Sequence, residues 1–215
     1  MTVAPPNPIE LVHVDAHCIV ALKPAGLPSV PGRGPELQDC AHARVLERHA
    51  DARVVHRLDM ATSGLLVFAR GAEAQRRLSQ AFAERRVDKR YVAVVAGRVE
   101  AASGRIDLPL IADWPNRPRQ KIDPQHGKAS STFYRLLERD IDDDTTRLEL
   151  QPVTGRAHQL RVHLLAIGHP ILGDALYAPD AVRDRAPRLL LHACALELPH
   201  PLDGTPLRLS SAAPF

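Results

Sequence analysis

The sequence predicts an α+β protein, because short apolar runs typical of strands are interspersed with stretches whose apolar residues recur at helical spacing. Its 215 residues are 45% hydrophobic and 25% charged, which supplies enough apolar side chain for a core and excludes a disordered chain. No internal repeat and no linker interrupts the pattern. We therefore expect a single domain over residues 1–215.

The first part of the chain is predicted to pair strands and then to alternate loops with helices. In order, we expect strands at 9–14 and 18–22, a turn at 23–26, a loop at 28–35, a helix at 37–48, a loop at 56–64 between buried strands at 54–55 and 65–69, and a helix at 72–86. The turn is predicted because Pro24 fixes φ and Gly26 permits a positive φ. The second helix is predicted because Ala74, Leu78 and Ala81 share one helical face.

The second part is predicted to be richer in strands. We expect a strand at 91–95 that ends before Gly97, an exposed loop at 114–121, a hairpin of strands at 135–139 and 146–150, and a helix at about 158–167. The loop at 114–121 contains two prolines and is mostly polar, which argues against a regular element. Gly168 stands where a C-terminal cap of the last helix belongs.

Charge and cysteine content restrict the class of protein only mildly. The formal net charge of +3 is compatible with a nucleic-acid partner but equally with a basic, inert surface. Cys18, Cys40 and Cys194 form no CxxC pair, so neither a zinc knuckle nor a disulfide framework is indicated. The N-terminus lacks the pattern of a signal peptide and no apolar stretch approaches transmembrane length. We expect a cytoplasmic protein without a membrane partner.

Asp59 is the first candidate for chemistry, because it lies in the polar loop between two buried strands, with Arg57 two residues before it. A carboxylate in such a loop can act as a nucleophile or a base. It can equally cap a backbone N–H of the turn, which is the commoner role of aspartate in turns. The local sequence leaves both roles open.

A second cluster of functional side chains lies at the start of the helix predicted at 158–167. It comprises Arg156, His158, Gln159, Arg161 and His163. Arginines at a helix N-terminus favour an anion, although a polar face over solvent is the alternative. His158 and His163 are five residues apart and do not share a helical face, so we expect no metal site there.

Sequence motifs of cofactor-dependent enzymes and hydrolases are missing. The chain contains no GxSxG elbow, no GxGxxG turn and no phosphate-binding GKS/T loop. We therefore expect no cofactor, and a metal- or serine-dependent hydrolase is unsupported.

Six short segments occur in the same order as the motifs of one enzyme family. They are 23–27 (KPAGL), 56–65 (HRLDMATSGL), 89–93 (KRYVA), 155–163 (GRAHQLRVH), 168–174 (GHPILGD) and 191–193 (LHA). Together they resemble the RluA-type RNA pseudouridine synthases over nearly the whole chain. Within that family, the short chain and the segment 111–118 (IADWPNRP) resemble the dual-specificity branch that acts on ribosomal large-subunit RNA and tRNA. Since only about twenty residues precede the motif at Lys23, we expect no N-terminal S4-type RNA-binding domain of the kind that longer relatives carry.

The resemblance implies a fold and a set of catalytic residues. The fold would be a mixed, mostly antiparallel sheet with flanking helices and a central catalytic cleft. Asp59 would attack the ribose C1′ of the target uridine or act through a glycal, and Arg161 would pair with Asp59. Tyr91 would stack on the uracil and assist loss of the C5 proton, with Leu160 packed nearby. Arg57 would help to extrude the base and fill the vacated stack.

The resemblance also implies an RNA partner, held as a structured stem-loop in which the target base is unstacked. Candidate RNA contacts are the motif residues His56, Thr62, Arg156 and His158, and the basic residues Arg117, Arg119 and Lys121 of the exposed loop. A second basic cluster, Arg85, Arg86, Lys89 and Arg90, is equally consistent with a solvated helix end. We expect a monomer without an obligatory protein partner. The alternative function is a catalytically idle RNA-binding module of the same fold.

Overall fold

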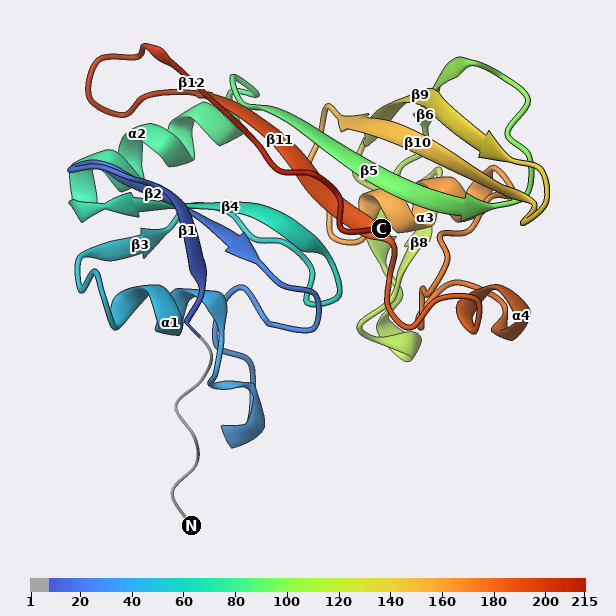
Figure 1. Ribbon diagram of the computed structural model, residues 1–215, viewed down its shortest axis with the longest axis horizontal. Helices are drawn as coiled ribbons and strands as arrows, with labels where there is room; N and C mark the ends of the chain where they lie inside the picture. Colours follow the sequence, from blue (N-terminus) through green and yellow to red (C-terminus); the bar gives the residue numbers. More distant parts are fainter. Residues whose placement is uncertain (1–7) are drawn as a thin grey trace. The chain divides into compact units, whose positions relative to one another are not determined.

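The computed structural model describes residues 8–215, and they form two compact units. The first unit comprises residues up to Val87 together with Ala193–Ala212, and the second comprises Asp88–His192 and Ala213–Phe215. Each unit has its own antiparallel strands and its own helices (Figure 1). Each also has its own cluster of buried apolar residues.

The first unit is built from strands in the order β1-β2-β4-β11, with β3 on β4 and β12 on β11. Its elements are β1 Glu10–Val14, β2 Cys18–Lys23, the 3-10 helix η1 Pro35–Leu37, α1 Ala41–Leu46, β3 Ala52–Val54, β4 Ser63–Arg70, α2 Gly71–Ala83, most of β11 Leu191–Pro199, and β12 Pro206–Ser210. The pairs β1–β2, β2–β4, β3–β4 and β11–β12 are antiparallel. α2 packs its Ala74, Leu78 and Ala81 face against Leu65 and Val67 of β4, as the helical spacing predicted (Figure 1).

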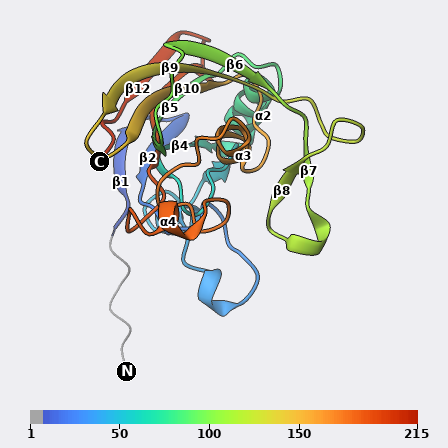
Figure 2. The ribbon, with the colours of Figure 1, turned by 90° about the vertical axis from the view of Figure 1, so that its right-hand side faces the viewer.

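The second unit carries a curved antiparallel sheet in the order β5-β10-β9-β6 and a separate β7–β8 hairpin. Its elements are β5 Asp88–Ala96, β6 Ser103–Asp107, β7 Leu110–Ala112, the 3-10 helix η2 Trp114–Asn116, β8 Gln120–Ile122, β9 Ser131–Asp140, β10 Thr145–Pro152, α3 Gln159–Ala166 and α4 Asp180–Arg183. Leu110 of the hairpin, Val162 of α3 and Tyr177 form one buried cluster. Figure 2 shows the hairpin extending away from β6 and β9, with η2 at its tip.

The strands and helices expected from the sequence are present, with two corrections. The helix expected at 37–48 begins only at Ala41, because the N–H groups of Ala41 and His42 donate to the carbonyls of Pro28 and Ser29. The loop expected at 114–121 ends in a strand, since Gln120 pairs with Ala112 of β7. The acidic hairpin and the cap at Gly168, whose φ is +86°, are as predicted.

Asp15 closes the turn between β1 and β2. Its Oδ1 accepts from the backbone N–H groups of His17 (2.7 Å) and Cys18 (2.8 Å), and its Oδ2 lies 2.6 Å from Nε2 of His13 and 3.0 Å from Nε2 of His200. Burial raises the pKa of this carboxyl, but the hydrogen bonds outweigh burial and hold the pKa well below its usual range. Ligand atoms of His13, Asp15 and Cys18 lie within 4.8 Å of one another, and the turn cap explains this grouping without an ion.

Among residues 8–215, no helix is long and apolar enough to cross a membrane.

Candidate active site

The backbone on both sides of Asp59 is held by two buried side chains. Nζ of Lys23, a residue with 0% exposure, donates to the carbonyls of Pro24 (2.9 Å), Leu27 (2.7 Å) and Met60 (3.0 Å). The Ser29 hydroxyl donates to the carbonyl of Leu58 (2.7 Å) and accepts from its N–H (3.0 Å). The backbone is therefore fixed at both Leu58 and Met60. This restricts the direction in which the half-buried side chain of Asp59 points from the backbone.

The rest of the loop is fixed by contacts within the first unit. Nε2 of His56 accepts from the N–H of Val67 (3.1 Å), and its ring stacks on Phe82 with centroids 4.5 Å apart. Gly64 has φ +118°, and a Cβ there would lie 2.4 Å from the backbone oxygen of Ala193, so only glycine fits. These contacts give His56, predicted to touch RNA, a structural role in the loop. Arg57 and Met60, by contrast, have exposed side chains.

In the second unit, a buried amide organises the approach to α3. The side chain of Gln159, 3% exposed, accepts from Thr154 Oγ1 (2.7 Å) and the N–H of Arg156 (3.1 Å). It donates to the Ser131 carbonyl and to Thr132 Oγ1, both at 3.0 Å. All of its polar atoms are bonded, so the turn before α3 is fixed rather than free to adapt.

Arg161 is buried on α3 and is held by Asp174. Its Nε donates to Asp174 Oδ2 at 2.8 Å and its Nη2 to Asp174 Oδ1 at 2.5 Å, with side-chain exposures of 4% and 1%. The N–H groups of Leu176 and Tyr177 also donate to Asp174 Oδ1. A bidentate pair of this kind fixes the plane of the guanidinium. Asp174 accepts from two of the five guanidinium N–H donors, so the ion pair does not use all the hydrogen-bond donors of Arg161. The expected pairing with Asp59 stays a prediction.

The remaining residues assigned to catalysis lie on the same unit as Arg161. Tyr91 is half-buried on β5, opposite Leu150 of β10, and Leu160 is buried on α3. Nδ1 of His158 lies 2.6 Å from the Tyr177 hydroxyl, and His158 has the left-handed φ of 54° directly before the helix.

His163 is a structural residue. It is fully buried, with Nδ1 3.0 Å from Thr132 Oγ1 and Nε2 3.0 Å from the Leu108 carbonyl. Burial lowers the pKa of its imidazole, so the ring is neutral at neutral pH. Neither its partners nor its separation from His158 suits metal binding.

The candidate RNA contacts of the hairpin are all exposed. Arg117 lies over the ring of Trp114, with its guanidinium carbon 4.4 Å from the ring centroid. Arg119 donates to the carbonyl of Leu176 and lies over Tyr177 at 5.6 Å. Lys121 and Arg156 are also exposed, and Nε of Arg156 donates to the Ala129 carbonyl at 3.3 Å.

The second basic cluster is largely neutralised by neighbouring acids. Arg86 pairs with Glu84 at 2.8 Å, and Arg90 approaches Glu149 at 3.8 Å. Lys89 is half-buried, and burial lowers the pKa of its ammonium group. This pairing favours the solvated-surface explanation of the cluster over a phosphate-binding one.

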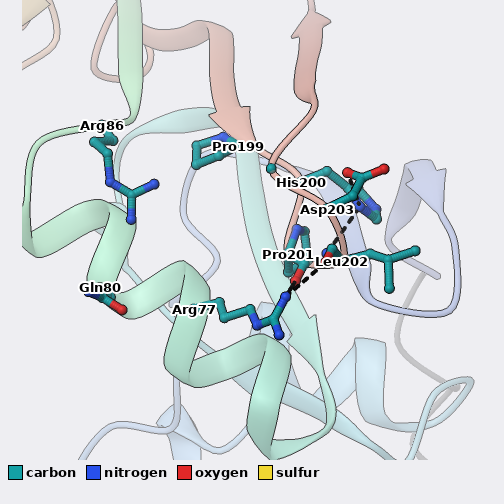
Figure 3. A pocket seen from close by; sticks show the side chains of 9 residues that line it. Arg77, Gln80, Arg86, Pro199, His200, Pro201, Leu202 and Asp203 are labelled. Carbon is teal, nitrogen blue, oxygen red and sulfur yellow. Dashed lines mark hydrogen bonds and ion pairs between the residues drawn. The ribbon is translucent and has the colours of Figure 1, made fainter.

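The first unit also contains a pocket of about 300 Å³. It lies between α2 and the β11–β12 turn, where Arg77 donates to the carbonyls of Pro201 and Leu202 (Figure 3). Arg77 also pairs with Glu73 at 2.7 Å. Of the residues considered for catalysis or RNA contact, only Arg86 of the second basic cluster lines this pocket. Arg77 and Arg86 already pair with Glu73 and Glu84, so we assign the pocket no catalytic role.

Four residues that hold the candidate site were not predicted to do so: Lys23, Ser29 and Asp174 were given no role, and Gln159 was only named in the polar cluster at the helix start. Lys23, Gln159 and Asp174 stand inside the quoted motifs, which was the available signal. Ser29 lies in the Pro- and Gly-rich loop, and nothing in the sequence distinguishes it.

Comparison with known proteins identifies the family. The family model described as RNA pseudouridylate synthase matches residues 17–166. The chain is 50% identical to the dual-specificity RNA pseudouridine synthase RluA of Yersinia pestis over 95% of this chain and 99% of the relative. It is 48% identical to the Escherichia coli K12 protein of the same name over 96% and 94%. The solved structure of human RNA pseudouridylate synthase domain containing 1 matches 100% of this chain and 87% of its own, with a TM-score of 0.83 and 29% identity.

The fold therefore agrees with the expectation from the sequence, an α+β protein with a mixed, mostly antiparallel sheet and few helices. The agreement extends from the short motifs to nearly the full length of both chains. The chain belongs to the RNA pseudouridylate synthase family, enzymes that isomerise uridine in RNA to pseudouridine.

Proposed function

We propose that this enzyme isomerises specific uridines in both ribosomal large-subunit RNA and tRNA. The observation that carries the proposal is the 50% identity to a synthase named dual-specificity, over 95% of this chain and 99% of the relative. The pattern IADWPNRP at 111–118 is the local feature of the sequence that points to the same branch.

In the proposed reaction Asp59 is the nucleophile. Its carboxylate attacks the ribose C1′, or acts through elimination to a glycal, and the bond from C1′ to N1 of the uracil breaks. The uracil turns within the site and a bond forms from C5 to C1′. At the same step the bond from the Asp59 oxygen to C1′ breaks or, on the glycal route, C2′ regains the proton that it lost in the elimination. The C5 proton is then lost and N1 gains a proton, so the reaction is an isomerisation with no net oxidation. The hydrogen bonds of Lys23 and Ser29 beside Asp59 support this role, because a weak nucleophile must be aimed.

Arg161 is proposed to hold Asp59 ionised and oriented. A guanidinium beside a carboxylate favours its charged form and gives the pair a fixed direction. The bidentate bond to Asp174 supports the proposal, since a guanidinium that is itself immobilised orients a carboxylate better than a mobile one. Asp174 is thus a positioning residue for Arg161.

Three further residues are proposed to handle the base. Tyr91 stacks on the uracil and assists removal of the C5 proton, and Leu160 packs near the ring. Arg57 fills the space that the extruded base leaves in the RNA stack. The exposure of Arg57, next to His56 whose ring is held by Val67 and Phe82, supports its role toward RNA.

The decisive experiment measures tritium release from RNA labelled at C5 of uridine, with a chelator present. The purified chain should release tritium from both ribosomal RNA and tRNA, and Asp59→Ala should release none. Tight RNA binding without release by the wild type would favour the idle RNA-binding module. Release that requires a metal would favour a different chemistry. Mapping pseudouridines in a deletion strain then identifies the positions, and loss from only one RNA class would remove the dual specificity.

A further inference from the structure

The tip of the β7–β8 hairpin carries the one tryptophan of the chain. Trp114 has 65% of its surface exposed, although indole is among the largest apolar side chains. No role in catalysis or packing accounts for it, because the buried cluster of this region is formed by Leu110, Val162 and Tyr177. A large aromatic surface kept in water on a structured turn indicates a binding function.

The backbone beneath Trp114 is well ordered by local hydrogen bonds. Trp114 begins the short helix η2, and the Asn116 N–H and amide Nδ2 donate to the carbonyl and to Oδ2 of Asp113, both at 2.9 Å. The Asp113 N–H donates to the Arg119 carbonyl at 2.9 Å, which closes the turn. Trp114 therefore presents a ring with only two side-chain torsions from a fixed turn, so little conformational entropy is lost when a partner binds.

The start of β8, directly beside the tip, is anchored to the rest of the unit. The Gln120 N–H donates to the Tyr177 hydroxyl at 2.8 Å, and Arg119 donates to the Leu176 carbonyl. Tyr177 is in turn fixed by Asp174 through its own N–H. The hairpin tip is thus attached to residues 174–177, the segment that also immobilises Arg161.

The charges around the indole suit a polyanion. Arg117, Arg119 and Lys121 are exposed on the hairpin, against the single carboxylate of Asp113. The Arg117 guanidinium lies over the ring of Trp114 at 4.4 Å, so one face of the indole carries a cation. Aromatic rings bordered by arginine and lysine are how proteins hold unpaired nucleotides, with the ring stacked on a base and the cations on phosphates.

We propose that Trp114 is a stacking platform for an unpaired base of the substrate RNA other than the target uridine. The base lies against the indole, Arg117 stays over the ring from the other side, and Lys121 contacts a flanking phosphate. This inference rests on the proposed function, since it assumes that the partner is RNA, and it narrows the substrate to RNA with an unpaired nucleotide besides the one that is modified.

The sole tryptophan makes the proposal directly measurable. The full-length chain is titrated with a synthetic RNA stem-loop that contains an unpaired uridine, and with the same stem closed into a continuous duplex. Emission of Trp114 should be quenched, saturably, by the stem-loop and should change little with the duplex, in which no base face is available. Equal quenching by both RNAs would overturn stacking on an unpaired base.

Three variants show whether RNA affinity depends on an aromatic ring at position 114 or is lowered by removing any exposed apolar side chain. Trp114→Ala should weaken binding of the stem-loop about tenfold, equivalent to about 1.4 kcal/mol, whereas Trp114→Phe should stay within about threefold of wild type because it keeps an aromatic face. Ile141→Ala is the matched control, since Ile141 is 83% exposed on the turn between β9 and β10 and should bind as wild type does. Unchanged affinity of Trp114→Ala would overturn the proposal.

The rate at saturating RNA distinguishes this platform from the chemistry. Trp114→Ala should raise KM for the stem-loop and leave kcat close to that of wild type. If wild type releases no tritium from any RNA, the proposed function fails, whatever the fluorescence shows. If wild type isomerises uridine and its emission does not respond to bound stem-loop, the platform alone is wrong.

Discussion

The loop around Asp59 is held by buried side chains, whereas the β7–β8 hairpin exposes the aromatic and cationic side chains at and beside its tip. Lys23 and Ser29 bond to the residues on both sides of Asp59, and both are at most 5% exposed. In the hairpin, Trp114 and the three cations are exposed and mainly the backbone is fixed. The difference matches two tasks, because bond breaking needs a carboxylate aimed within tenths of an ångström, whereas RNA capture needs accessible charge and aromatic surface.

Within the second unit, Asp174 connects the buried side chain of Arg161 to the support of the exposed hairpin. One of its oxygens accepts from Arg161 and from the N–H groups of Leu176 and Tyr177, and Tyr177 accepts from the hairpin at Gln120. The residue that fixes Arg161, the arginine proposed to act in catalysis, therefore also fixes the support of the hairpin that we propose binds RNA. Substitution of the buried residues that hold Asp59 and Arg161 should lower the reaction rate or the free energy of unfolding. Substitution of the exposed hairpin residues should lower RNA affinity.

The largest effect is expected from Asp59→Ala. Isomerisation should be abolished, because we propose that this carboxylate breaks the bond between uracil and ribose. RNA affinity should stay within about tenfold of wild type, roughly 1.4 kcal/mol. Tritium release and a filter-binding titration on the same RNA measure the two quantities. Substantial turnover by the purified variant would remove Asp59 from the mechanism and with it the basis of the comparison.

Asp174→Ala should produce the largest loss of stability. It leaves the Arg161 guanidinium buried without its bidentate partner, and breaking a buried pair typically costs about 3–5 kcal/mol. Urea denaturation monitored by circular dichroism gives the free energy of unfolding. Asp180→Ala is the matched control, because Asp180 pairs with Arg183 in solvent at 84% exposure and its loss should leave the midpoint unchanged. Equal midpoints for the two variants would contradict the clamping role of Asp174.

The same substitution at two lysines tests the comparison directly. Lys23→Met keeps the volume of the buried side chain but removes the donor to the Met60 carbonyl, so Asp59 is aimed less well. A misplacement of about 1 Å can cost roughly 100-fold in rate, and we expect kcat to fall by up to that factor with little change in RNA affinity. Lys121→Met should instead weaken RNA binding and preserve kcat. If Lys23→Met mainly weakens binding, the loop around Asp59 is not held as we describe.

Local patterns in the sequence were sufficient for most of the fold. Alternation and β-formers located the strands, and the spacing of Ala74, Leu78 and Ala81 located the buried face of α2. The errors arose where distant backbone groups decide. The carbonyls of Pro28 and Ser29 set the start of α1, and pairing with β7 makes a strand of Gln120 and Lys121 despite two nearby prolines.

The candidate site was predictable only through its motifs, and the residues that support it were not. Lys23 reaches across 37 positions to Met60, and Arg161 across 13 to Asp174, so neither contact has a signature in local sequence. Moreover, a buried lysine is rare unless it is paired, so Lys23 at 0% exposure could not be expected from composition or periodicity.

Arg57 is an exposed side chain in an otherwise clamped loop, and it should matter in proportion to the difficulty of base extrusion. Flipping a base costs a few kcal/mol in a paired strand and less in an unstacked one. Arg57→Ala should therefore slow modification of a structured stem-loop about tenfold and leave an unstructured oligomer nearly unaffected. Single-turnover rates on the two RNAs measure the ratio. An equal loss on both would place Arg57 in the chemical step instead.

The smallest effect is expected from a single hairpin cation, and it should appear in the salt dependence of binding. Each phosphate contact contributes a slope of about −0.7 to −0.9 in a plot of log affinity against log salt, because bound counterions are released. Lys121→Ala should flatten this slope by about one contact and weaken affinity only a few-fold at moderate salt. Arg119→Ala should also flatten the slope, but it removes the bond to the Leu176 carbonyl and so disturbs the hairpin itself. Lys121 is therefore the sharper probe, and wild-type slopes for Lys121→Ala on both the stem-loop and the duplex would mean that the hairpin carries no phosphate contact at this position.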